Sequence, residues 1–516
     1  MESRGISEKI EKLNIIRCWR MDLMEIYNKD NFRNRILLLY LIPILFIVIT
    51  IRVSFGNVIW SDEVYSLELS AKKFADILRI DSMDVHPPLY YFLLRIAFIA
   101  GGIFNINNIV SGKLLSVIAE ILLFYIGATK INAIFGRNSS ILYCLFLVAM
   151  PQMMEYFTEI RMYGLGALFV TCTYLYGMDV LNDDNDRKAY ILLTIFSIFS
   201  VYTHYYACIG SFIVYIEMLV FLFSKRKYNA IKKVFVSGII VAVSFVPWIL
   251  VLTGQLKTVK ADYWIPPVSL SSIKTDLNFI IAENDFKISK LAILLLISFG
   301  AAGIILLKKN KKDYYAYGAA AAISVLLGTY FVGIAVSIAM RPVFVSRYLF
   351  CSLPCFWLGI AIGLSEFYSF MKTNKLVRCI LVLILLISVI NTSYGFLTRE
   401  SERQKNDDIA VSKIKDIAGA DTVIVCNLYS LCRTLVYYCP ERQTYYTGEI
   451  PYIATELHDN GNFNEITVDD IKNYSNIIVC DNNNELYETL SNMGLTLEKQ
   501  GDFAHYWDSY TMYYIK

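Results

Sequence analysis

Five short segments carry the side chains that could do chemistry, because each places acids, imidazoles or guanidinium groups beside long apolar runs. A positioned carboxylate or imidazole can take a proton from a hydroxyl group, and a guanidinium group suits the oxygens of a phosphate. The segments are Trp60-Ser61-Asp62-Glu63, Asp84-Val85-His86-Pro87-Pro88-Leu89-Tyr90-Tyr91, Glu159-Ile160-Arg161-Met162-Tyr163, Tyr202-Thr203-His204-Tyr205-Tyr206 and Ser346-Arg347-Tyr348.

Each segment also has an ordinary structural interpretation. Asp62 and Glu63 suit a solvated helix end, and Pro87-Pro88 suits a simple chain break. Glu159 and Arg161 suit a packing ion pair, since buried charges need partners, and Arg347 suits a side chain that reaches lipid headgroups. His204 alone suits a satisfied histidine at a helix end. Only their placement on one side of a membrane would favour a shared site.

The composition predicts that membrane. Of 516 residues, 56% are hydrophobic and only 18% are charged, whereas roughly a quarter of the residues in a soluble protein are charged. A helix needs about 20 apolar residues to cross a bilayer, and we predict about eleven such spans in an all-α polytopic fold. Their expected starts are Ile36, Val110, Ser139, Tyr163, Ala189, Tyr205, Val234, Leu291, Tyr314, Tyr348 and Leu376.

The positions of the positive charges predict the orientation, because Lys and Arg concentrate in short cytoplasmic loops. Basic breaks occur at Lys130 and Arg137, at 187–188, at 225–233, at 308–312 and at 372–378, in addition to the N-terminal arm. They alternate consistently with eleven spans. We therefore expect a multi-pass protein of the cytoplasmic membrane with its N-terminus inside and its C-terminus outside, which puts all five segments on the outer face.

The stretch Pro88 to Phe104 is apolar but short, and it contains Arg95. An arginine at the bilayer centre is costly, so we predict a helix in the outer interface. The residues before it, 64–78, have an apolar face at helical spacing. The first outer loop, residues 56–109, is therefore expected to be long, helical and close to the membrane.

Three parts are expected along the chain: a cytoplasmic arm over 1–33, a transmembrane catalytic domain over 34–398, and a small extracytoplasmic α/β domain over 399–516. Short apolar runs at Thr422–Val425 and Asn476–Val479, separated by polar helical stretches, indicate strands in the last part. Disulfides in three pairings or free thiols both remain open for its four cysteines, which are Cys426, Cys432, Cys439 and Cys480.

The order Trp-x-Asp-Glu, Asp-Val-His-Pro-Pro-Leu-Tyr-Tyr, Glu-x-Arg-Met-Tyr, Tyr-Thr-His-Tyr and Arg-Tyr, from Trp60 to Arg347, resembles the GT-C glycosyltransferases. It is most similar to the family 39 type, which is related to protein O-mannosyltransferases and aminoarabinose transferases. The resemblance implies an inverting transfer of a monosaccharide from a polyprenyl phosphate. It also implies an acidic catalytic residue in the first outer loop.

The resemblance suggests a role for each residue. Asp62 would be the base, and Glu63 would orient the acceptor or a metal. Arg161, Arg347 and His204 would bind the donor phosphate, with Glu159 holding Arg161. The remaining substrate-binding candidates are His86, Tyr163, Tyr205 and Tyr348. The acceptor could be a protein, a glycolipid or an envelope polymer.

Other readings stay open at this stage. A divalent cation is possible near Asp62, Glu63, His86 and His204, but no cofactor is required by the sequence. A lipid-linked sugar transporter or flippase would also need polar groups in the membrane, and a non-catalytic sensor could use the C-terminal domain. The expected partners are membrane lipid and the polyprenyl-phosphate sugar, with no nucleic acid.

Overall fold

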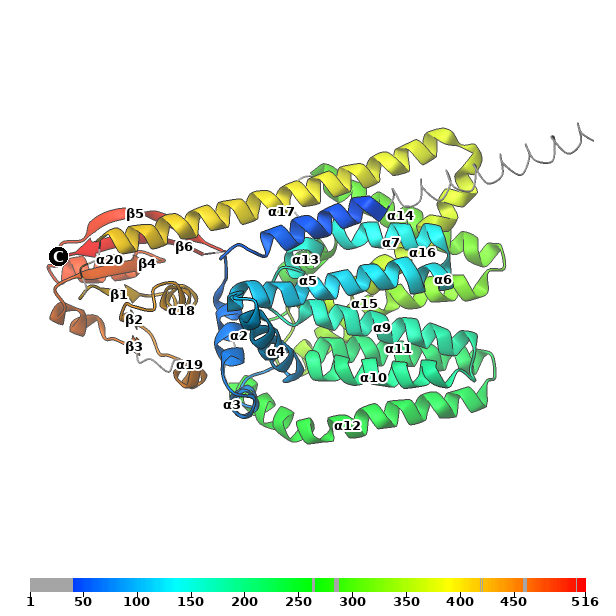
Figure 1. Ribbon diagram of the computed structural model, residues 1–516, viewed down its shortest axis with the longest axis horizontal. Coiled ribbons are helices and arrows are strands. Elements are labelled where there is room, and N and C mark those ends of the chain that lie inside the picture. The colour runs from blue at the N-terminus through cyan, green and yellow to red at the C-terminus, as the bar shows by residue number, and fades with distance from the viewer. Residues whose placement is uncertain are drawn as a thin grey trace, which may run out of the picture.

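The structure, a computed structural model, describes residues 40–261, 265–282, 287–417, 419, 421–457, 462–506 and 508–516. A bundle of helices is joined to a small sheet domain by one long helix (Figure 1). The predicted arm over 1–33 and the first residues of the first predicted span, 36–39, lie outside the described residues.

Eight helices in this part of the chain are long and apolar enough to cross a membrane. The first, Asn108–Phe135, combines α5 (Asn108–Ile126), the π-helix η1 (Gly127–Ile131) and α6 (Asn132–Phe135). The others are α9 (Tyr163–Asn182), α11 (Tyr205–Ser224), α12 (Tyr228–Ala261), α14 (Lys287–Lys309), α15 (Asp313–Ala339), the run of η2 (Ser346–Ser352), α16 (Leu353–Phe370) and η3 (Met371–Thr373), and α17 (Lys375–Ile417).

Three shorter helices account for the other predicted spans: Tyr40–Val53, α7 (Arg137–Ala149) and α10 (Arg187–Thr203). α7 is short because Pro151 follows it, and Met150 before the proline is extended with ψ of 153°, as that position favours. About eleven helices were expected, and all eleven are present, eight of them at full spanning length. The chain is therefore an integral membrane protein.

Close packing holds the centre of the bundle together. α9 and α16 are the most enclosed spans, with 89% and 94% of their apolar windows buried by other parts of the protein. At the crossing of α14 and α16, a Cβ added to Gly303 would overlap the carbonyl oxygen of Gly363. Small residues permit such backbone contact between membrane helices.

The loop predicted to be the first outer one folds into three helices, α2 (Ser61–Ala71), α3 (Phe74–Asp81) and α4 (Leu89–Ile103). The amphipathic stretch predicted over 64–78 is interrupted by Lys72, whose ψ of 173° ends α2. Arg95 of α4 donates from Nη1 to the carbonyl oxygen of Ala71 at 2.8 Å. A free carbonyl oxygen at the end of α2 thus accepts a hydrogen bond from Arg95, the residue whose charge made a membrane-spanning α4 unfavourable.

The C-terminal part is an α/β domain, as predicted. Its six strands are ordered β3-β2-β1-β4-β6-β5, with β1 to β4 parallel and the β5–β6 hairpin antiparallel at one edge. The strands are β1 (Val423–Cys426), β2 (Thr444–Tyr446), β3 (Phe463–Glu465), β4 (Ile477–Asp481), β5 (Glu498–His505) and β6 (Asp508–Ile515). The short helices are α18 (Tyr429–Tyr438), α19 (Tyr452–Leu457), η4 (Val468–Asn473) and α20 (Glu485–Asn492).

Both faces of the sheet are buried, because alternate residues of a strand point to opposite sides. Ile424 and Cys426 of β1 face a core with α17 and α18, whereas Val423 and Val425 face one with α20. The four cysteines of this domain are buried and are free thiols in the structure, with no disulfide between them. α17 runs without a break across the predicted domain boundary between residues 398 and 399, as far as Ile417 (Figure 1).

Candidate active site

Asp62 lies in the first turn of α2, where an acidic side chain is favoured by the helix dipole. Its Oδ2 is 3.2 Å from Nη2 of Arg347 and 3.9 Å from Nη2 of Arg161. Arg161 also donates from Nη1 to the backbone oxygen of Asp62 at 3.0 Å and to Oγ of Ser66 at 3.1 Å. Asp62, Arg161 and Arg347, which are far apart in the sequence, therefore form one acid–arginine centre.

The loop before α9 and the start of η2 supply the two arginines. Arg161 is almost fully buried, with 3% of its surface exposed. Burial opposes its charge, but Asp62 and the neighbouring tyrosines outweigh this effect and raise its pKa. The guanidinium group therefore stays charged over any working pH, as a binding group for a phosphate requires.

Glu63 follows Asp62 but serves a different purpose. Its Oε2 accepts the backbone N–H of Trp60 at 3.1 Å, and its Oε1 accepts the backbone N–H of Ile160 at 2.6 Å. Burial raises the pKa of Glu63 to about 7. The carboxyl joins the start of α2 to the loop that carries Arg161, so it positions both charged groups.

Glu159 holds Trp60, not Arg161 as expected from the sequence. Its Oε1 accepts the indole N–H of Trp60 at 3.0 Å, and its backbone oxygen accepts from Ser116 at 2.6 Å. Arg161 is close in sequence, but its described hydrogen bonds go to α2. Burial, together with the charge of Glu63, raises the pKa of Glu159 well above its ordinary value.

The two predicted histidines lie next to each other, with ring centroids 5.7 Å apart. Nδ1 of His86 is 3.0 Å from Oδ2 of Asp84, so this nitrogen donates and Nε2 is left basic. Nδ1 of His204 accepts the backbone N–H of Tyr206 at 3.1 Å, so its proton is on Nε2. One ring can thus accept a hydrogen bond where the other donates one.

The electrostatics keep these tautomers in place. Burial, the neighbouring imidazole of His86 and the charges of Arg161 and Arg347 lower the pKa of His204 well below 6.5. Burial alone would raise the pKa of Asp84, but its hydrogen bond to His86 and the nearby positive charges lower it. His204 is therefore neutral and Asp84 ionised near neutral pH.

The predicted tyrosines surround the histidines. The ring centroid of Tyr348 is 4.9 Å from His204, and that of Tyr163 is 5.6 Å from it. The hydroxyl of Tyr205 instead donates to Gln255 at 2.5 Å and accepts from the Trp248 indole at 3.1 Å. Tyr205 therefore belongs to the wall of the site rather than to its charged centre.

An apolar cavity of about 330 Å³ opens beside this cluster. It is lined by His86, His204, Tyr205 and Tyr348, and by apolar side chains of α11, α12 and α15 that include Ile209, Leu252 and Val336. The lining thus combines histidine and tyrosine side chains with hydrocarbon ones.

The C-terminal domain holds the start of the first outer loop. The hydroxyl of Tyr438, on α18, donates to the backbone oxygen of Asn57 at 3.0 Å and accepts from the N–H of Ile59 at 3.1 Å. Arg433 forms an ion pair with Glu68 of α2 at 3.1 Å. Tyr506, at the β5–β6 turn, stacks on Trp60 with centroids 5.7 Å apart.

Four contributors were missed from the sequence. Trp60 and Asp84 stand in the quoted motifs but were assigned no role, although an indole beside two acids and an Asp-x-His pair were available signals. Tyr206 packs on Tyr348 at 4.8 Å. Tyr506 carried no signal, because only the fold brings the C-terminal hairpin to Trp60.

The metal question was left open from the sequence. Among the described residues, no group of three or more His, Cys, Asp and Glu side chains is arranged to hold a metal ion. Glu63 uses both carboxylate oxygens on backbone amides. The suggested set of Asp62, Glu63, His86 and His204 therefore does not converge on one point.

Solved structures share this architecture. Apo ArnT, an aminoarabinose transferase from Cupriavidus metallidurans, superposes with a TM-score of 0.59 at 12% identity, over 91% of this chain and 97% of its own. The structure of ArnT bound to undecaprenyl phosphate gives 0.57, with the same identity and coverage. The chain has the GT-C fold. The mycobacterial arabinofuranosyltransferase AftD matches at 0.47 and 11% identity, over 91% of this chain and 41% of its own.

No protein-family model and no curated protein sequence matches the chain. At 12% identity, the likeness to ArnT is a likeness of fold. The GT-C fold nevertheless agrees with the motif order read from the sequence. The activity has to be argued from the residues of this site.

Proposed function

We propose that the chain is an inverting glycosyltransferase that moves a monosaccharide from a polyprenyl phosphate to an acceptor at the outer face of the membrane. The observation that carries the proposal is the Asp62–Arg347–Arg161 centre, together with an apolar cavity whose lining includes Tyr348, the residue after Arg347. A base, two fixed cations and a hydrocarbon pocket are the parts this reaction needs. The fold shared with ArnT, which was solved with undecaprenyl phosphate, supports the same choice.

The reaction is a single displacement. The acceptor hydroxyl oxygen forms a bond to the anomeric carbon, and the bond from that carbon to the phosphate oxygen breaks. The polyprenyl phosphate leaves with the electron pair, while Asp62 takes the hydroxyl proton. A carboxylate is an adequate base when the transition state has oxocarbenium character.

The arginines serve the leaving group. Negative charge grows on the phosphate as the bond breaks, and fixed guanidinium groups stabilise such charge most in a desolvated site. Binding of phosphate to Arg347 would also weaken its ion pair with Asp62, which leaves the carboxylate free to meet the acceptor hydroxyl when donor is present. His204, with its proton on Nε2, is placed to donate to the phosphate, and His86 accepts from a hydroxyl.

The two buried glutamates, Glu63 and Glu159, act by positioning other residues. Glu63 and Glu159 position the α2 start and Trp60, respectively, through the hydrogen bonds described above. Tyr163, Tyr348 and Tyr205 shape the walls around the headgroup. We therefore assign base chemistry to Asp62 and positioning to the two glutamates.

The test uses purified protein in nanodiscs with a panel of polyprenyl-phosphate monosaccharides and envelope extract as the acceptor source. Release of polyprenyl phosphate is compared among the native chain, Asp62→Asn and Asp76→Asn, which alters a carboxylate of α3 in the same loop. We expect Asp62→Asn to lose about 10²–10⁴-fold in rate, as expected for a general base, and Asp76→Asn to behave as native.

Equal release by the native chain and Asp62→Asn would contradict the role of Asp62. The absence of release from every donor, with acceptor extract present, would contradict the enzyme and favour a transporter or a sensor. With the protein reconstituted in liposomes instead of nanodiscs, movement of the lipid-linked sugar across the bilayer, without transfer of the sugar to an acceptor, would identify a transporter.

A further inference from the structure

A second cavity, of about 480 Å³, lies between α8 (Met153–Tyr156), α17 and the β5–β6 turn. Unlike the cavity beside His204, it is lined mainly by polar side chains. The lining side chains that matter for binding are Gln152, Glu155, Glu402, Arg403, Asn406 and Tyr506. The motif analysis and the proposed reaction use none of them.

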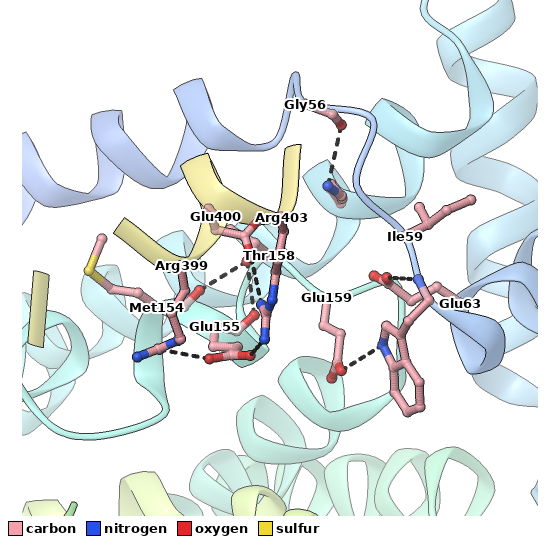
Figure 2. A network of polar contacts seen from close by, with 12 residues as sticks. Gly56, Ile59, Glu63, Met154, Glu155, Thr158, Glu159, Arg399, Glu400 and Arg403 are labelled. Carbon is pink, nitrogen blue, oxygen red and sulfur yellow. Dashed lines mark hydrogen bonds and ion pairs between the residues drawn. The ribbon is translucent and has the colours of Figure 1, made fainter. Parts of the chain in front are cut away.

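A rigid ionic clamp forms the floor of this cavity. The Oε2 of Glu155 is 2.9 Å from Nη2 of Arg399, and its Oε1 is 3.1 Å from Nη2 of Arg403 (Figure 2). Arg403 also pairs with Glu400 at 2.7 Å. Burial would raise the pKa of Glu155, but the two arginines outweigh it and lower the pKa. The carboxylate therefore stays ionised and fixed.

Tyr506 closes the cavity from the C-terminal domain. It occupies the turn between the paired residues His505 and Asp508, and its φ is +56°. A bulky residue is unusual in this left-handed region, where Asn or Gly is expected. Its ring centroid lies 3.8 Å from the guanidinium carbon of Arg403, and the ring stacks on Trp60. These contacts hold Tyr506 in the lining of the cavity.

Trp60 separates this cavity from the reacting centre. Tyr506 packs on the indole, and the guanidinium carbon of Arg347 lies 5.1 Å from the same ring system. Arg347 in turn binds Asp62. The packed series of Tyr506, Trp60 and Arg347 therefore connects this cavity with the carboxylate of Asp62.

The charges decide what kind of molecule fits. The lining contains two arginines and two glutamates, Glu155 and Glu402, so their formal charges cancel. Both arginines are already engaged by Glu155, which leaves little attraction for a phosphate or carboxylate. Carboxylates, carboxamides and a phenol provide donors and acceptors together, which suits the hydroxyl groups of an uncharged sugar.

We propose that this cavity binds the neutral carbohydrate part of the acceptor, on the far side of Tyr506 and Trp60 from Asp62. The inference rests on the proposed function, because it supplies the second substrate of that reaction. It divides the two substrates between two cavities on opposite sides of Trp60 and Arg347. The C-terminal domain then contributes directly to acceptor binding through Tyr506.

The test measures sugar binding without any donor lipid. Saturation-transfer NMR on the full-length protein in nanodiscs would use methyl glucoside, methyl mannoside, methyl galactoside, maltose and lactose, with glucose 6-phosphate and glucuronate as charged probes. The variants are the double change Glu402→Ala with Asn406→Ala, and Tyr506→Phe, which keeps the ring and removes the hydroxyl. Lys405→Ala, an exposed neighbour on the same helix outside the lining, is the matched control.

We expect at least one neutral probe to bind the native chain, and the double variant to bind it about tenfold more weakly, as expected for two lost hydrogen bonds. Tyr506→Phe should weaken binding about threefold to tenfold for one bond, and Lys405→Ala should not change it. Unchanged binding in both variants, preference for the charged probes, or no binding of any neutral probe would each overturn the proposal. Because no turnover is measured, these outcomes are distinct from failure of the lipid-release assay.

Discussion

The cavity beside His204 and the cavity beside Tyr506 differ in the helices and strands that form them. The cavity beside His204 is lined by membrane helices α11, α12 and α15, whose apolar side chains suit a lipid tail. The cavity beside Tyr506 is lined by the extension of α17 and by the sheet hairpin, whose side chains are charged or polar. The side chains of the apolar membrane helices therefore favour a lipid in one cavity, and the polar side chains of α17 and the hairpin favour a polar molecule in the other.

Their arginines differ in the same way. Arg347 pairs with Asp62, whose side chain is 32% exposed, at 3.2 Å. Arg403 is bound by both Glu155 and Glu400, whose side chains are 14% and 15% exposed. An arginine whose carboxylate partner is partly exposed can exchange that partner for a phosphate, whereas an arginine held by two well-buried carboxylates acts as structure.

The largest effect is expected from replacing Arg347, which tests directly whether the two arginines differ in role. Arg347→Lys keeps the charge but loses the planar fork, so polyprenyl-phosphate release should fall about 100-fold, which is the scale of losing one charge-stabilising donor. Release is measured in nanodiscs at saturating donor. Arg403→Lys is the comparison and should lower thermal stability more than rate; equal losses of rate would erase the distinction.

Trp60→Phe tests the wall between the cavities. The ring face remains for Tyr506, but Oε1 of the buried Glu159 loses its indole donor, at a cost of about 1–3 kcal/mol in unfolding free energy. Chemical denaturation in nanodiscs measures it. Trp248→Phe is the matched change, since Tyr205 keeps Gln255 as a partner; a larger loss for Trp248→Phe would contradict this account.

Leu252→Trp sharpens the assignment of the apolar cavity. The larger side chain would occupy space needed by the lipid, and we expect the KM for the polyprenyl-phosphate donor to rise about tenfold, which corresponds to about 1.4 kcal/mol. Initial rates of lipid release at several donor concentrations give the KM. Neutral-sugar binding should stay unchanged, and a shift of sugar binding in this variant would show that the cavities are not separate.

The smallest effect is a pH dependence from His204. Its pKa is lowered in the folded protein, so the unfolded chain binds more protons below its ordinary value of 6.5. The stability contributed by the neutral ring is present above pH 6.5 and falls as the pH drops, by at most about 1.4 kcal/mol per pH unit. Melting temperatures from pH 7.5 to 5.5 should fall less steeply for His204→Asn than for the native chain, and identical slopes would contradict it.

The sequence determined the features that depend on local composition. Long apolar runs predict membrane helices because an unpaired backbone cannot cross hydrocarbon outside a helix or barrel, and the described spans agree. The short apolar runs after residue 398 likewise predicted the sheet domain. The motif order led to the GT-C fold, and it brought Asp62, Arg161 and Arg347 under consideration before their contact was visible.

Only the tertiary structure decided how adjacent residues divide their roles. Asp62 and Glu63 are neighbours on one helix turn, yet one meets two arginines and the other meets two backbone amides, because side chains one position apart point in directions about 100° apart. Glu159 lies in the bend before α9, and only the folded path of that bend brings it to Trp60. Tyr506 reaches the site only because α17 carries the sheet domain back over the first outer loop, and no local pattern in a sequence encodes a contact across more than 400 positions.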